Sequence, residues 1–112
     1  MKNSDADLIQ RTLEGDQQAF TALVEKYQKQ IHALAWQKIG DFHTAQEIAQ
    51  DAFLTAYHKL ATLTHHSQFA GWLYVITNNK CKNWHRKKKL ALQSLEATDP
   101  IELEEVYYSE YM

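Results

Sequence analysis

The sequence contains few of the residues that break helices. Its 112 residues include three glycines and one proline. A β-sandwich or barrel needs many turns, and turns draw heavily on both residue types. The shortage therefore argues against an all-β fold and favours long helices, in a chain whose length suits one domain.

Membrane spans and secretion signals are lacking as well. No run of about 18 apolar residues occurs, so no membrane insertion is expected. The first ten residues, MKNSDADLIQ, have no apolar stretch of the kind found in secretory signal peptides. Cys81 is the only cysteine, which excludes an internal disulfide and suits a reducing, cytoplasmic location.

Signatures of catalysis and of metal binding are also missing. The sequence has no glycine-rich phosphate loop, no nucleophile elbow and no HExxH zinc motif. Cys81 and His85 stand one helical turn apart, but tetrahedral zinc needs four ligands at recognisable spacing. We therefore expect a protein that is not an enzyme and that has no metal and no cofactor.

Charges of opposite sign are segregated along the chain. Residues 80–89 hold six of the twelve Lys and Arg residues and no acid, whereas residues 90–112 hold six acids and no Lys or Arg. A dense cluster of cations needs a local partner, and a polyanion such as nucleic acid is the first candidate. The simpler alternative is a solvated helix end, whose cations complement the helix dipole.

Apolar residues recur at helical spacing in four segments, which predicts an all-α fold, a compact bundle of four main helices with an acidic C-terminal tail. The predicted helices lie between Ser4 and Gly15 and over about residues 17–39, 44–60 and 68–89. The residues predicted to cap their N-termini are Ser4, Asp16, Thr44 and Ser67. Residues 90–112 are interpreted as a linker or tail, in which a short helix from Ile101 is one alternative.

The segment FAGWLYVITNNKCKNWHRKKK, residues 69–89, combines apolar residues with amides and cations. Its apolar members have core-facing spacing, and core packing is favoured for Trp72, whereas Trp84 is expected to be exposed or at an edge. Asn79 and Asn83 carry amides that both donate and accept hydrogen bonds, so they suit base edges.

Three sequence blocks resemble a known family. They are DADLIQRTLEGDQQAFTALVEKYQKQIHALA, GDFHTAQEIAQDAFLTAYHKL and the segment 69–89, and together they cover about residues 5–90. In this order they resemble region 2 of bacterial extracytoplasmic-function (ECF) sigma factors, in the sigma-70 superfamily. The resemblance implies a region 2 domain over residues 1–90. Residues 91–112 would then be a linker toward a missing helix-turn-helix domain, in a truncated protein or a natural single-domain variant.

The resemblance also implies partners and site residues. The third helix would bind the clamp helices of the largest subunit of core RNA polymerase. The residues implied in that contact are Gln46, Glu47, Gln50, Asp51 and Leu54. The loop before the fourth helix, together with that helix, would take the non-template strand of the promoter −10 element. The residues implied in that DNA contact are Thr64, His65, His66, Ser67, Asn79, Lys80, Asn83, Arg86, Lys87 and Lys88.

Some positions depart from the family pattern. Gln46-Glu47 replaces the usual acidic pair, and Val75 stands where an arginine is common. The pair His65-His66 is unusual in the loop that captures a flipped-out base in the family, so the base preference cannot be carried over. Core binding and one phosphate contact are therefore expected to differ from the family pattern.

The resulting expectation is a sigma factor domain that recognises and melts the −10 element as part of the polymerase holoenzyme. The alternative is a regulatory module that engages polymerase or an anti-sigma factor without opening promoters. A membrane-surface helix is disfavoured, because the cations cluster at one end and not along one face. Because net charge −6 follows net charge +6, a further hypothesis is that the tail folds back and masks the DNA face.

Overall fold

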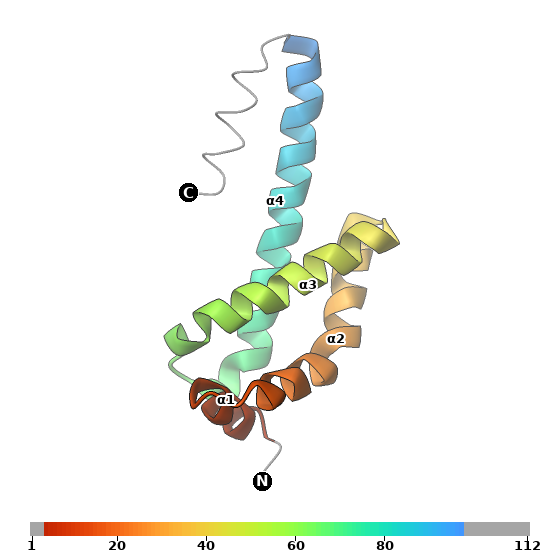
Figure 1. Cartoon of the computed structure of the whole chain (residues 1–112). Coiled ribbons are helices and arrows are strands. Elements are labelled where there is room, and N and C mark those ends of the chain that lie inside the picture. The colour runs from red at the N-terminus through yellow and green to blue at the C-terminus, as the bar shows by residue number, and fades with distance from the viewer. Residues whose placement is uncertain (1–3, 98–112) are drawn as a thin grey trace.

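The computed structural model describes residues 4–97, and its regular elements there are all helical (Figure 1). The elements are α1 (Asp5–Leu13), α2 (Gln17–Ile39), α3 (Phe42–Lys59), the 3₁₀ turns η1 (Leu60–Thr62) and η2 (His66–Gln68), and α4 (Phe69–Ala97). The predicted all-α bundle of four main helices is confirmed. The alternative helix from Ile101 lies outside the described residues.

The first two helices begin and end as predicted. The Ser4 hydroxyl accepts a hydrogen bond from the Asp7 amide at 3.1 Å, and the Asp16 carboxylate accepts one from the Gln18 amide at 3.0 Å. Gly40 ends α2 with a φ of 82°, in the left-handed region where a side chain would be strained. Local capping chemistry therefore fixes these boundaries.

The predicted caps of the third and fourth helices are wrong. Asp41 caps α3, because its carboxylate accepts from the Thr44 amide at 2.8 Å and from the Thr44 hydroxyl at 2.5 Å. Thr44 is thus the third residue of α3 and not its cap. Ser67 lies inside η2, so a 3₁₀ turn leads into α4 in place of a serine cap.

The fourth helix is longer than predicted. It continues eight residues past residue 89, to Ala97. The added segment LALQSLEA is rich in strong helix formers and holds no Gly or Pro, so propensity extends the helix after the apolar periodicity has ended. In Figure 1 the second half of α4 projects beyond its crossing with α3.

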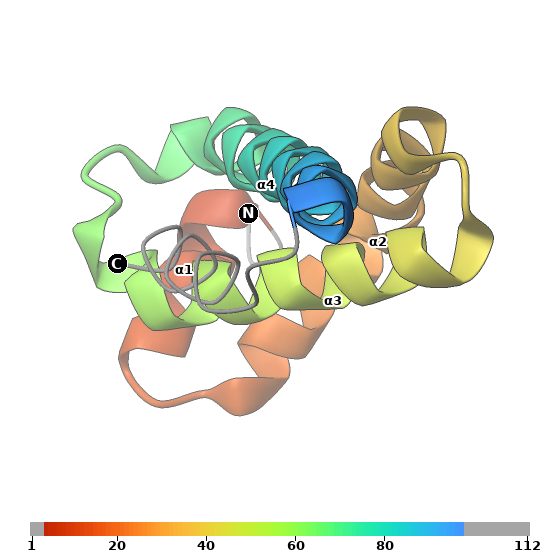
Figure 2. The same ribbon diagram turned by 90° about the horizontal axis from the view of Figure 1, so that it is seen from above.

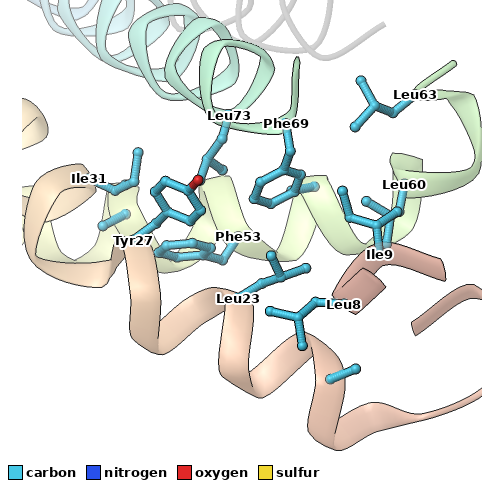
Figure 3. Packing of buried hydrophobic residues seen from close by; sticks show 13 residues of the cluster. Leu8, Ile9, Leu23, Tyr27, Ile31, Phe53, Leu60, Leu63, Phe69 and Leu73 are labelled. Carbon is cyan, nitrogen blue, oxygen red and sulfur yellow. The ribbon is translucent and has the colours of Figure 1, made fainter. Parts of the chain in front are cut away.

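The main core lies where α1, α2, α3 and the start of α4 meet (Figure 3). Phe69 and Leu73 anchor α4 there and are fully buried, and Trp72 and Ile76 pack against the cluster while partly exposed. Truncating a buried Phe to Ala typically costs about 3–5 kcal/mol, so Phe69 fixes the start of α4 firmly.

A second, smaller cluster lies farther along α4. It contains Ala35, Ala45, Ile48 and Cys81, with Trp84 packed at its edge as predicted. Two alanines at this point let α2 and α3 approach α4 closely, and the view from above shows α4 lying over α3 beside α2 (Figure 2). Both α2 and α3 therefore pack against α4 at the point where its basic half begins.

Candidate nucleic-acid and polymerase interfaces

A continuous exposed stripe follows α4 outward from the bundle. Its members recur every three or four residues, so they share one face of the helix, and each is exposed. They are Gly71, Val75, Asn79, Lys82, Arg86 and Lys89. At 1.5 Å per residue the stripe is about 27 Å long. Its first two residues, Gly71 and Val75, are apolar, Asn79 carries an amide, and the last three residues are cations.

The stripe contains some of the predicted DNA-binding residues and not others. Asn79 and Arg86 lie on it. Lys82 also lies on it, although it was not among the predicted contacts. Lys82 lies three residues after Asn79 and four before Arg86, so helical spacing alone would have placed it on the same face.

Three other predicted residues, Lys80, Asn83 and Lys87, line a cleft between α3 and α4. Ile48 and Asp51 of α3 and Trp84 complete the lining of this cleft, called here the α3–α4 cleft. The ammonium of Lys80 lies 2.9 Å from a carboxylate oxygen of Asp51. A residue predicted to bind DNA and one predicted to bind polymerase are therefore paired with each other.

Lys88 lies apart from the stripe. Its ammonium is 5.0 Å from the ring centre of Trp84, a cation–π arrangement. The pKa of the Asp41 carboxyl is lowered, mainly by its hydrogen bonds with Thr44, and the charge of Lys88 adds to the effect. Lys88 thus lies over Trp84, on a different side of α4 from Asn79 and Arg86.

The loop before α4 borders the apolar start of the stripe. Thr64, His65 and Ser67 are exposed and His66 is half-buried, while the Gln68 amide donates to the His65 carbonyl at 2.9 Å. A shallow apolar cleft, called here the loop cleft, lies beside this turn. It is lined by Leu63, Gln68, Gly71, Trp72 and Val75. Since Gly71 and Val75 belong to both features, the loop cleft opens onto the stripe.

The predicted polymerase residues share the outer face of α3. All five are exposed, on the side opposite the buried alanines of that helix: Gln46, Glu47, Gln50, Asp51 and Leu54. Leu54 is 55% exposed, so this face offers an apolar side chain to a partner. Polar groups with an exposed apolar centre are typical of a protein-binding surface.

The remaining titratable candidates have structural surroundings. Cys81 is buried, and this burial raises the pKa of its thiol. His85 contacts a main-chain carbonyl. Within residues 4–97 no group of three or more His, Cys, Asp or Glu could hold a metal ion. In the same part of the chain, no helix is both long and apolar enough to cross a membrane.

Comparison with known proteins identifies the family. A family model described as Sigma-70 region 2 matches residues 23–91. The chain is 37% identical over 81 residues to the ECF RNA polymerase sigma factor SigW of Bacillus subtilis, a match covering 72% of this chain and 43% of that protein. It is 40% identical over 82 residues to the RNA polymerase sigma-H factor of Pseudomonas aeruginosa, covering 73% and 42%. The ECF RNA polymerase sigma-E factor of Escherichia coli is 36% identical over 83 residues, covering 72% and 42%. The matches thus span less than half the length of these relatives. The chain belongs to the sigma-70 region 2 family, as a domain of the ECF sigma factor type.

Proposed function

We propose that this chain is a sigma factor domain that binds core RNA polymerase and holds the non-template strand of the −10 element during transcription initiation. The observation that carries the proposal is the continuity between the loop cleft and the cationic end of the stripe. One single strand could place a base in the apolar cleft and its following phosphates along the cations. The domain acts by binding and not by catalysis, and it would act in the cytoplasm, where polymerase meets DNA.

The loop cleft suits an unstacked base. Trp72 offers an aromatic side chain, and a base stacked on an aromatic ring contributes about 1–3 kcal/mol. Thr64, His65 and Ser67 present exposed polar groups beside it. Because flipping a base out of a duplex costs a few kcal/mol, a cleft of this kind stabilises melted over paired DNA.

The stripe supplies the electrostatic part of binding. Its cations Lys82, Arg86 and Lys89 would give a salt slope of about −2 on single strands, since each neutralised phosphate contributes about −0.7. If all six cations of residues 80–89 faced phosphates, the slope would be about −4. The geometry favours the smaller value, because Lys80 is paired with Asp51, Lys87 lines the α3–α4 cleft and Lys88 faces another side.

Polymerase binding is proposed for the outer face of α3. Gln50→Ala and Leu54→Ala should each weaken capture of this domain by core polymerase, whereas Gln28→Ala, an exposed change on α2, should not. Equal capture of all three variants would show that α3 is not the contact.

DNA recognition is tested by fluorescence anisotropy with single-stranded oligonucleotides that carry varied −10 sequences. Sequence preference together with a salt slope near −2 supports the proposal. Binding to core polymerase with no preference among oligonucleotides would instead favour the regulatory module, which engages polymerase, or an anti-sigma factor, without opening promoters.

A further inference from the structure

The α3–α4 cleft joins the two proposed binding surfaces. Asp51 lies on the outer face of α3, and Lys80 lies one residue after Asn79 of the stripe. The side chain of Lys80 is 23% exposed, whereas that of Asp51 is 59% exposed. The carboxylate is therefore open to a partner, while the ammonium is turned into the cleft.

The ion pair is weak enough to be exchanged. Pairs between partly exposed charges contribute about 0–1 kcal/mol to stability, because water screens them. An arginine from a partner can bind a carboxylate through two parallel hydrogen bonds, which a lysine cannot match. A partner that offers an arginine could therefore bind Asp51 in place of Lys80 without unfolding the domain.

The charge of the α3 face indicates the chemistry of that partner. Residues 46–54 contain two acids, Glu47 and Asp51, and no Lys or Arg. A complementary surface must therefore present cations. Once its carboxylate is occupied, the long flexible side chain of Lys80 can swing from the cleft toward a phosphate held beside Asn79 and Asn83.

We propose that the α3–α4 cleft is an interaction surface at which a cationic side chain of polymerase displaces Lys80 from Asp51 and so releases Lys80 to bind DNA. The inference rests on the proposed function and deepens it, because it couples the two surfaces. Asp51 then weakens DNA binding by the isolated domain. By linkage, DNA and polymerase must each strengthen the binding of the other.

The test uses the isolated domain and a single-stranded oligonucleotide carrying its preferred −10 sequence. Asp51→Asn keeps the shape of the side chain and removes its charge. It should raise affinity about two- to fivefold at low salt, the equivalent of an exposed ion pair. It should also steepen the salt slope by about 0.7, for one added phosphate contact.

Two further variants separate this coupling from a change in net charge. Glu47→Gln makes the same charge change one turn earlier on the same face of α3, and it should have a clearly smaller effect. In a protein that also carries Lys80→Gln, there is no lysine for Asp51→Asn to release. There Asp51→Asn and Glu47→Gln should change the DNA affinity by the same amount. Equal effects of Asp51→Asn and Glu47→Gln would overturn the inference, while the proposed function would stand.

Capture by core polymerase tests the coupling in the reverse direction, from Lys80 to polymerase binding. Lys80→Gln should strengthen capture by core polymerase, because Asp51 is no longer held within the domain, whereas Lys59→Gln, an exposed change at the end of α3, should not. Unchanged capture with Lys80→Gln would also count against the coupling. If the wild-type domain bound no single strand at low salt, the proposed function would fail and the inference with it.

Discussion

The imidazole Nε2 of His85 lies 2.7 Å from the main-chain carbonyl oxygen of Lys38, which joins the basic half of α4 to the last turn of α2. The carbonyl can only accept, so Nε2 carries the proton that is donated. The last carbonyls of a helix lack donors within the helix, and His85 supplies one from α4. This contact helps to set the direction in which the stripe leaves the bundle.

Replacing this histidine should loosen the junction. We expect His85→Ala to lower the free energy of unfolding by about 0.5–1.5 kcal/mol, the usual net contribution of a hydrogen bond. Urea denaturation measures the change. His65→Ala, an exposed change in the loop, should stay within about 0.5 kcal/mol of wild type. A His85 variant as stable as the His65 variant would mean that the contact does not hold α4.

Tyr27 should make the fold sensitive to alkali. Burial and then its hydrogen bond with Asp5 raise the pKa of the Tyr27 phenol above the ordinary value of 10.0. A raised pKa in the folded state contributes stability that is present below pH 10 and is lost as the pH rises above it, with a limiting slope of about 1.4 kcal/mol per pH unit for one proton.

The measurement is the difference in unfolding free energy between wild type and Tyr27→Phe, followed from pH 8 to about 11. The difference should shrink or reverse in favour of the variant above about pH 10, because phenylalanine has no proton to lose. Parallel loss of stability in both proteins would show that other groups cause the alkaline unfolding.

Much of the fold was predictable because its determinants are local. Ser4 and Asp16 bond to amides two or three residues away, and the apolar spacing of α2 gave its limits. The cap of α3 was missed because Asp41 and Thr44 are both good N-cap residues, and their mutual hydrogen bonds decide between them. The end of α4 was missed because residues 90–97 have high helix propensity but lack the apolar periodicity from which the helices were predicted.

The candidate site was predictable only as a set of residues. Motif resemblance named Asp51 and Lys80 as binders of different partners, although they are 29 residues apart in sequence and form an ion pair. Pairing of this kind depends on how α3 packs against α4, which no local pattern encodes. Likewise Lys80, Arg86 and Lys88 look alike in a run of cations, and only the helix geometry assigns them to different sides.

The Asp41 cap should matter most at neutral pH. Its hydrogen bonds with the side chain and amide of Thr44 lower the pKa of the Asp41 carboxyl. A lowered pKa in the folded state gives stability that is present above the unfolded value of 3.8 and is lost as the pH falls through the folded value. Asp41→Ala should therefore lower the thermal midpoint at pH 7 and have much less effect at pH 2–3, as measured by circular dichroism. Equal losses at both pH values would argue against a charged cap.

Lys82 should contribute to DNA binding without contributing to sequence preference. Lys82→Gln removes a cation from the middle of the stripe, so the salt slope should become shallower by about 0.7 and affinity should fall by the same factor for every oligonucleotide. Lys29→Gln, an exposed change of equal charge on α2, is the control. A slope changed as much by Lys29→Gln as by Lys82→Gln would show that net charge, and not the stripe, governs binding.

Asn79 should affect sequence preference and not the salt slope, the opposite of Lys82. It stands between the apolar start of the stripe and its cations, one helical turn after Val75 of the loop cleft, so we expect its amide to contact a base edge. Asn79→Ala should therefore leave the salt slope near its wild-type value and reduce discrimination between −10 variants by about 1–3 kcal/mol at one position, the amount typical of a specific contact to a base edge. Anisotropy titrations over a panel of single-base changes, at two salt concentrations, separate the two quantities. If Asn79→Ala weakens all oligonucleotides equally and flattens the salt slope, Asn79 acts on the backbone, and base reading must be assigned to the loop cleft alone.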